Sequence, residues 1–597
     1  MRRVFFFVLL QCEAFVLQQQ QQQCASRWRK RVLRAQEDDG ADVVIIGAGY
    51  GGLSAAALLA TYNKRVTVVE SHDRVGGVAH AFEREGYTLD VGPSLWSGLS
   101  TPSTNPMRQV LDATGAARDL EWRTYDGWGV HEVKTGRKFR MTTSGSVFGE
   151  VAAEFGDVDE WSAFLESVEP VFEASASCPP MALTLNPLGF LKEAFLPYLL
   201  PAIAKSSFRK GTFVPDLLTG PASKLHVFRK RGFVSRWIDY LAFAISGLPA
   251  NGTVGAAVAY SVGDLYLRRG SYADYPVGGS AAVAEALKKT IEEKGGSVLL
   301  KAHVAAINIS DNIARGVTLR DGTFVAANDA VVSNADLWTT AALTGDDAWI
   351  KDLHKNLVAT PSFLHLWVGF DAKGLPEDLD GHHTVLVDGT FADDDVPIDA
   401  RANMMIVCIS SFFDASVAPE GKHLAHVYAA ATEPREDWDN FDSRQSYDDA
   451  KTRAMEPLWR ALEAIVPDVR RRSDLVVAGT PRSHEFWNRR HRGTYGPTTF
   501  AQGTTPVATN LYTVGDSNFP GIGIPAVAAS ACLVANAIAG RKAHADLLSA
   551  MRTNNTLRAG SDWWHLALQH RPSPLPGGTL SSSSNDEYSS ENKMASS

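Results

Sequence analysis

Three features are scarce in this sequence: cysteine, an excess of basic residues, and long uninterrupted apolar runs. The chain of 597 residues has five cysteines, Cys12, Cys24, Cys178, Cys408 and Cys532, and they show no paired spacing. This scatter argues against a disulfide framework and against a zinc site. The formal net charge of −9 provides no general basic surface, so we expect no nucleic-acid partner. With 45% hydrophobic residues the chain can still bury a large core, divided into two or more lobes.

The first 40 residues have the composition of a two-part targeting leader. A charged start and the apolar run VFFFVLL, too short to cross a bilayer, are followed by Ala14 and Phe15. The later stretch ASRWRKRVLRAQ is basic and contains no acid, as in transit peptides. Residues 1–40 therefore predict delivery to a plastid bounded by extra membranes, with an ordinary secretory signal as the alternative. Residues 558–597, rich in Pro, Gly and Ser, predict a disordered tail.

The stretch DVVIIGAGYGGLSAAALLATYNKRVTVVE, Asp42 to Glu70, reads as strand, helix and strand. Gly47 allows a tight turn, Gly49 lets the backbone approach a pyrophosphate, and Gly52 permits close packing of the helix on the strand. Glu70, at the end of the second strand, is placed to accept hydrogen bonds from a ribose. The stretch therefore predicts a dinucleotide-binding fold.

Two further glycine turns and a C-terminal motif favour FAD over NAD, because FAD is long and must be wrapped along its ribityl chain. Arg74, Gly76 and Gly77 form the second turn, and Asp90 to Ser94 form a third close backbone approach. Near the C-terminus a strand ends at Gly515-Asp516, and a helix of small residues begins after Gly523. Asp516 is expected to bind ribityl or phosphate groups, and the helix to direct its positive end at the flavin. The third close backbone approach and the start of the C-terminal helix contribute five more expected cofactor residues: Gly92, Pro93, Ser94, Gly523 and Ile524.

These motifs, together with the blocks YPVGGSAAVAEAL, VVSNADLW, SVAPEGKHLAHVY and GTPRSHEFWNRRHRGTYGP, resemble the carotenoid cis-trans isomerase and phytoene desaturase family of flavoproteins. The resemblance runs from about Asp42 to Gly540, and the last two blocks are most similar to the isomerase branch. It implies that the backbone at Val304 contacts the adenine. Plant-type isomerases differ at Ile522, Pro525 and Ala531, where this chain is more similar to desaturases and retinol-saturating relatives.

The resemblance implies an α/β fold with two lobes: a Rossmann-like FAD domain built from separate segments, and a substrate domain of mixed sheet and helices. The FAD domain is expected to take residues 41–110, 256–345 and 476–545. The substrate lobe is expected to take residues 111–255 and 346–475.

Several other residues are candidates for functional sites. His382 and His383 lack an acidic or cysteine partner at metal-ligand spacing, so a loop pair is expected and no metal is assigned. Asp393, Asp394 and Asp395 read as a solvated loop. Two interpretations are open for His484, Trp487, Arg489 and Arg490: they belong to a structural hairpin, or they face the substrate cavity. No catalytic acid or base can be assigned.

The segment NPLGFLKEAFLPYLLPAI, residues 186–203, is apolar but is interrupted by charges and prolines, so it does not suit a membrane span. With the basic residues that follow it, up to Phe233, it predicts monotopic contact with a membrane, such as a thylakoid or envelope membrane. Leu196 and Leu199 are its expected contact residues. The alternative is a buried helical pair with a solvated basic edge.

Three classes of function remain open. The first is a redox-neutral carotenoid enzyme that uses reduced FAD, with cis-trans isomerisation as the expected reaction and hydration of a xanthophyll as a neighbouring one. The second is a desaturase or saturase, which needs a quinone or another redox partner. The third is a non-catalytic lipid escort, for which an eroded flavin motif is expected; here the motif is intact.

Overall fold

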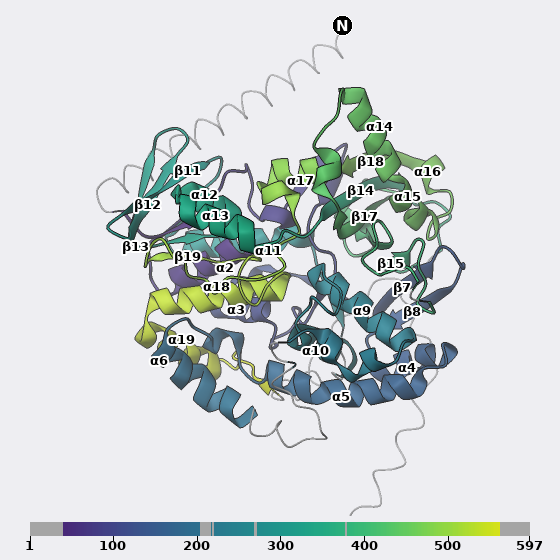
Figure 1. Ribbon diagram of the computed structural model, residues 1–597, viewed down its shortest axis with the longest axis horizontal. Helices are drawn as coiled ribbons and strands as arrows, with labels where there is room; N and C mark the ends of the chain where they lie inside the picture. The colour runs from purple at the N-terminus through teal and green to yellow at the C-terminus, as the bar shows by residue number, and fades with distance from the viewer. Residues whose placement is uncertain are drawn as a thin grey trace, which may run out of the picture.

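The computed structural model describes residues 40–202, 217, 220–267, 272–376, 379–393 and 395–560 (Figure 1). Nearly all of the predicted leader, most of the predicted tail, the basic residues Lys205, Arg209 and Lys210, and Asp394 lie outside the described residues. The expectations for those segments stay predictions.

The first large sheet has the strand order β10-β2-β1-β13-β12-β11, with β19 paired to β13. Its members are β1 (Ala41–Ile46), β2 (Val66–Val69), β10 (Ser297–Leu299), β11 (Val304–Ser310), β12 (Ile313–Leu319), β13 (Phe324–Ser333) and β19 (Leu511–Thr513). β1, β2, β10, β13 and β19 run parallel, whereas β11 and β12 form an antiparallel extension. Because β19 comes from near the end of the chain, this sheet joins segments that are far apart in the sequence.

Helix α2 (Tyr50–Thr61) lies at the centre of the first core, and its residues from Tyr50 to Ala60 are all buried. It packs against α3 (Pro106–Thr114), α11 (Gly279–Glu293) and α18 (Ile524–Ala539). The small residues of α2 and α18 allow this close approach. Three further helices complete the lobe: α12 (Leu337–Thr344), α13 (Asp347–Asn356) and α19 (Arg541–Thr553).

The second large sheet has the order β18-β14-β17-β16-β15-β7-β8. Its strands are β7 (Gly127–Glu132), β8 (Lys138–Thr142), β14 (Ser362–Asp371), β15 (His382–Leu386), β16 (Met404–Ile409), β17 (Lys422–Glu433) and β18 (Ser473–Gly479). Alternate residues of β16 enter two different cores, so both faces of the sheet are buried.

Helices cover the two faces of the second sheet. On one face lie α14 (Arg444–Ala454), α15 (Glu456–Glu463) and α16 (Val469–Arg472); the other side holds α4 (Gly145–Glu154), α5 (Val158–Ala176), α9 (Phe233–Ser246) and α10 (Gly255–Val262) (Figure 1). A cluster of aromatic rings, including Phe148, Trp161 and Trp237, fills the space between α4, α5 and α9.

Two small sheets and one indole hydrogen bond connect the lobes. The small sheets are β3 (Ala81–Arg84) with β4 (Tyr87–Asp90), and β5 (Trp96–Ser97) with β9 (Ala273–Pro276) and β6 (Trp122–Tyr125). Trp367 on β14 donates through Nε1 to the backbone oxygen of Asp90, at 2.7 Å. The end of β4 is therefore held directly against the second sheet.

The expected α/β fold with a dinucleotide-binding lobe and a mixed-sheet and helical lobe is confirmed. The exact segment bounds stay predictions, and one segment crosses between the expected lobes: Met181 and Ala194, placed by the sequence in the substrate lobe, are buried in the core around α2. The expected loop at His382 and His383 is wrong, because both residues lie on β15 and are buried.

Gly52 provides a test of the strand-to-helix packing. A Cβ at this position would lie 2.2 Å from the carbonyl oxygen of Gly47, so the Gly52→Ala variant must displace backbone. We expect a loss of about 2 kcal/mol of stability, typical of overpacking, seen as a lower melting temperature by circular dichroism.

Gly149→Ala on α4 is the matched control, because its new Cβ would meet Trp161 at an ordinary 3.4 Å. Equal melting temperatures for the Gly52→Ala and Gly149→Ala variants would contradict the packing role of Gly52.

Candidate flavin and substrate site

Four parallel strands of the first sheet end at one edge and place their following residues together. Gly47 directly follows β1, Glu70 follows β2, and Asn334 follows β13, whereas one residue separates Gly515 from the end of β19. The backbone N–H of Gly47 donates to Val69 at 2.8 Å, and that of Asn334 donates to Ile46 at 2.8 Å. The carboxyl edge of a parallel sheet is the usual position for a bound nucleotide.

The glycine turn after β1 leaves a backbone cradle at the start of α2. Gly47 has φ +90°, a conformation that favours glycine. The N–H of Gly76 donates to the carbonyl of Ala48 at 2.8 Å, so the second glycine turn packs against the first. Gly49 caps α2 with no side-chain hydrogen bond, and no acidic residue occupies the first turn. The free N–H groups of this turn suit a pyrophosphate.

The Glu70 carboxylate is fixed by backbone donors at the same edge. Its Oε2 accepts from the N–H of Ala48 at 2.6 Å, and its Oε1 accepts from the N–H of His72 at 2.7 Å. Oε1 also accepts from the Ser71 hydroxyl at 3.3 Å, so Oε2 is the oxygen that keeps a second lone pair available for a ribose hydroxyl. The position of Glu70 therefore fits the role that the sequence predicts.

Asn334 is a packing residue that sequence reasoning did not single out, although it lies in the quoted VVSNADLW block. A Cβ added at Gly49, Gly51 or Gly515 would lie 2.5 to 2.7 Å from its side-chain amide. Its amide thus fills the space between the first and last glycine motifs, and a side chain at any of the three positions would collide with it.

Arg490 and Asp516 form an ion pair beside the last glycine motif. The Arg490 guanidinium binds the Asp516 carboxylate through Nη1 and also donates to the carbonyls of Thr494 and Tyr495. Burial alone would lower the pKa of Arg490, but Asp516, together with Asp336 and Tyr495, outweighs that effect and raises it. A fixed positive charge therefore stands next to Asp516, a partner that the sequence did not reveal.

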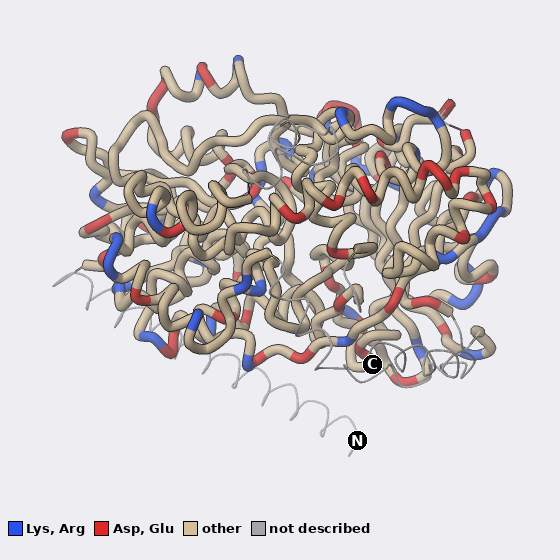
Figure 2. Tube along the Cα trace, turned by 90° about the horizontal axis from the view of Figure 1, so that it is seen from below, with Lys and Arg blue, Asp and Glu red and all other residues tan. Residues whose placement is uncertain are grey.

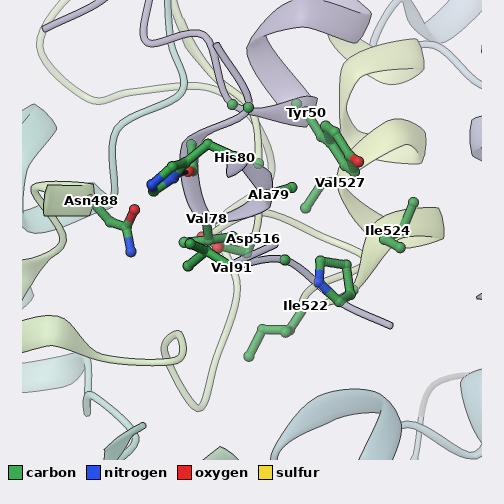
Figure 3. Close-up of a pocket in the computed structure, with 18 of the residues that line it drawn as sticks. Tyr50, Val78, Ala79, His80, Val91, Asn488, Asp516, Ile522, Ile524 and Val527 are labelled. Carbon is green, nitrogen blue, oxygen red and sulfur yellow. Dashed lines mark hydrogen bonds between the residues drawn. The ribbon is translucent and has the colours of Figure 1, made fainter. Parts of the chain in front are cut away.

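One cavity of about 460 Å³ joins the glycine turns to the second lobe. Of the expected cofactor residues, all line it except Gly52, which packs beneath the turn, and Ser94. Ser94 instead connects the lobes, because its Oγ hydrogen bonds to Nε2 of His382 at 2.8 Å and to the Tyr428 hydroxyl at 3.0 Å. Figure 3 places His80 and Asn488 on one side of the cavity and Tyr50, Ile524 and Val527 on the other.

The far part of the cavity is mainly apolar and aromatic, and it belongs to the second lobe and to β5. Its walls come from β5, β7, α9, β14, β16, β17 and the loop before α18. They include Trp96, Trp128, Tyr240, Leu241, Ile245, Phe363, Ile406, Tyr428, Tyr495 and Ile522. Ile522, one of the positions that differ from plant-type isomerases, lies at the boundary between the glycine turns and these apolar walls. A long apolar molecule would find complementary surface there.

Of the other candidate residues from the sequence, some line the cavity and others lie away from it. His484, Trp487, Arg489 and Arg490 all line the cavity, on or just after α17 (Pro481–Asn488). His383 pairs with His131 at 3.1 Å and lies away from the cavity walls. Asp393 and Asp395 are exposed in a bend. Among the described residues no group of three or more His, Cys, Asp and Glu side chains could hold a metal.

The cavity fits FAD by its own features. The glycine-turn end has a helix start with no side-chain cap and no acidic residue in its first turn, and a carboxylate held in place by backbone donors. The first turn of α18 also lines the cavity, beginning at Gly523 and Ile524. Its peptide dipoles place partial positive charge at the cavity wall, which would suit the negative charge of a reduced flavin.

Comparison with known proteins gives one family and several relatives. Residues 50–539 match the model of the flavin containing amine oxidoreductases. A chloroplastic prolycopene isomerase of Daucus carota is 31% identical over 83% of this chain and 80% of its own length. A lycopene-forming phytoene desaturase of Paracoccus is 25% identical over 82% of this chain and 95% of its own length.

Among solved structures, an oxidoreductase from Methanosarcina mazei superposes with a TM-score of 0.51 at 19% identity. The alignment covers 82% of this chain and 98% of that one. At this identity the likeness supports the fold alone.

Replacing Asp516 by Asn tests the ion pair. The change keeps the size of the side chain but leaves the Arg490 guanidinium buried without its counter-charge, so we expect a loss of about 3 kcal/mol of stability. We also expect lower flavin occupancy, measured as the ratio of absorbance at the flavin band to that of the protein.

Two variants separate these effects. Glu436→Gln breaks the exposed pair with Arg492 and should change stability by no more than about 0.5 kcal/mol. Arg490→Met combined with Asp516→Asn should regain part of the stability without regaining flavin. Full flavin occupancy in Asp516→Asn would contradict a cofactor role for Asp516.

Proposed function

This chain belongs to the flavin containing amine oxidoreductase family, and on that premise we propose that it is an FAD-dependent enzyme that isomerises a carotenoid polyene between cis and trans forms. The single observation that carries the proposal is the continuity of one cavity, from the glycine turns of the first lobe to the apolar walls of the second. The prolycopene isomerase relatives support the reaction class.

The proposed cofactor contacts follow the order of the glycine motifs. Glu70 holds the adenosine ribose, the backbone at Val304 contacts the adenine, and the start of α2 with Gly47, Gly49 and the Arg74 to Gly77 turn holds the pyrophosphate. The remaining residues, proposed along the ribityl chain and the ring, are Gly92, Pro93, Gly515, Asp516, Gly523 and Ile524.

When bound in its reduced form, FAD supplies an electron-rich ring that can lend electron density to a conjugated polyene and recover it. The residues of the chain provide the conditions for this chemistry. The first turn of α18 adds positive potential at the ring end of the cavity. The aromatic and aliphatic walls from α9, β14 and β17 exclude water and orient an extended substrate.

A second candidate is a desaturase, saturase or hydratase acting on a related polyene. Ile522 and Pro525 favour it, because both line the cavity at positions where this chain departs from plant-type isomerases. The phytoene desaturase and retinol reductase relatives belong to the same set of matches. A desaturase or saturase also requires a quinone or another redox partner. The intact cofactor cradle argues against a lipid escort without catalysis.

The oxidation level of the product distinguishes these reactions. Flavin-reduced enzyme in liposomes, incubated without oxygen with cis-carotenoids and then with xanthophylls, should give products of unchanged mass and altered retention by chromatography and mass spectrometry. Enzyme with oxidised flavin is the control and should give no product.

A gain of one water would instead indicate hydration. A change of two hydrogens with stoichiometric oxidation or reduction of the flavin would rule out the redox-neutral proposal and support the desaturase or saturase.

We further propose that the enzyme works in a plastid, at the surface of a thylakoid or envelope membrane. The chloroplastic relatives support the compartment. The segment of α6 (Pro187–Gly189) and η4 (Phe190–Leu199) supports membrane contact, because four leucines on or next to it are 41% to 55% exposed: Leu188, Leu191, Leu196 and Leu200. The opposite side of the segment is anchored by Ala194 in the first core.

We revise one of the two expected membrane-contact residues of this segment. Leu199 packs partly against the first core, so Leu200 replaces it as a contact residue. No helix within the described ranges is long and apolar enough to cross a membrane. Acidic and basic residues are interspersed along the trace (Figure 2), so we expect the leucines to contribute more to binding than the exposed basic run Arg229 to Arg231.

Charging two of the exposed leucines tests this contact. Leu196→Glu with Leu200→Glu removes apolar contact area and adds two charges, so we expect at least a tenfold loss of binding in a liposome flotation assay. Flavin content should stay unchanged, because both side chains point away from the core.

Phe324→Glu is the matched control, since Phe324 is 48% exposed on β13, away from the segment. Retained flotation of the double leucine variant would exclude this surface as the membrane contact.

A further inference from the structure

Three buried histidines form a polar patch in the wall of the otherwise mainly apolar cavity. His365 lies on β14, His426 on β17 and His484 on α17, and each is at most 6% exposed. All three line the cavity. Nδ1 of His365 and Nε2 of His426 are 3.0 Å apart, and the rings of His365 and His484 stack at 5.9 Å.

Two imidazole nitrogens of this patch have no hydrogen-bond partner within the part of the chain that the structure describes. Nε2 of His365 and Nε2 of His484 are both buried and make no hydrogen bond to the described residues. The side-chain amide of Asn488 donates to Nδ1 of His484 at 3.0 Å. In that arrangement the proton of a neutral His484 is on Nε2, which therefore presents an N–H donor. Buried polar atoms without a partner are rare and call for a ligand or another explanation.

The patch is electrically neutral, which limits what it can bind. Burial lowers the pKa of His365 to about 3 and that of His426 and His484 well below the usual value, with His365 adding to the effect on both neighbours. The charged and titratable groups that face His484 from neighbouring elements, Arg490 and His80, lower its pKa further. A neutral imidazole suits a hydroxyl or carbonyl oxygen better than a carboxylate or phosphate.

We propose that His365 and His484 hydrogen bond to an oxygen atom of the substrate, so that this enzyme selects a polyene carrying a hydroxyl or carbonyl group over a pure hydrocarbon. The inference rests on the proposed function and defines its substrate class. His426 is a positioning residue, because it orients the His365 ring through the Nδ1 contact and stacks on Trp367 at 4.7 Å. The apolar walls around the patch take the hydrocarbon body, which has no partner for these nitrogens.

The test compares two probes that differ only in oxygen. Binding of β-carotene and of its dihydroxylated counterpart zeaxanthin to the FAD-loaded protein is measured in liposomes, by quenching of tryptophan fluorescence at equal amounts of probe per lipid. We expect the wild type to bind zeaxanthin about tenfold more tightly, as for one buried hydrogen bond that is made instead of lost.

Substitutions test whether the three buried histidines cause the preference for zeaxanthin. His365→Phe and His484→Phe keep the ring shape but remove the nitrogens, so each should reduce the preference to within about twofold without weakening β-carotene binding. His484→Gln keeps an N–H donor and should retain part of the preference. His423→Phe is the matched control, because His423 lies outside the cavity walls, bound to Ser411 and stacked on Phe412.

Equal binding of the two probes by the wild type would overturn the proposal, and so would a preference that persists in both Phe variants with normal flavin content. If the protein binds neither probe, the proposed carotenoid function fails as well. If it binds and isomerises a hydrocarbon without any preference, only the histidine inference fails.

Discussion

Four parallel strands, β1, β2, β13 and β19, end at the same edge of the first sheet, and the cofactor site depends on this shared edge. The edge brings Gly47, Glu70, Asn334 and Gly515 together although they come from the beginning, the middle and the end of the chain. Asn334 then sets how closely the turns can approach, because its amide occupies the space that side chains at Gly49, Gly51 or Gly515 would need. The glycine pattern is thus a consequence of packing around one asparagine as well as of room for a nucleotide.

The second lobe closes over this edge through a small number of polar contacts. The Trp367 indole binds the end of β4, and Ser94 bonds to both His382 and Tyr428. These contacts place the third glycine approach beneath the sheet formed by β14 and β17. The polar and apolar parts of the cavity are therefore held in a fixed relation, with the expected ring position between them.

Sequence reasoning predicted the features that are encoded locally. The glycine turn, the small-residue helices and the acid at the end of β2 each follow from a short stretch with a definite spacing. These stretches predicted the dinucleotide-binding fold, and the resemblance to the flavoprotein family implied the two lobes. It missed the Arg490–Asp516 pair and the packing role of Asn334, because these depend on which distant strands become neighbours. His382 and His383 were expected in a loop; they lie on a strand buried on both faces, which leaves no alternation of polar and apolar residues to detect.

The discontinuity of the first sheet has a consequence for the order of folding. β1 is made early, but β13 and β19, which complete the sheet beside it, follow much later in synthesis. Pairing over such long sequence separations is slow, because chain entropy is lost before the contacts form. We therefore infer that the nucleotide edge is completed only after the second lobe has been made, and that a chain lacking the segment from β19 to α18 would expose the apolar surfaces of α2 and β13 to aggregation.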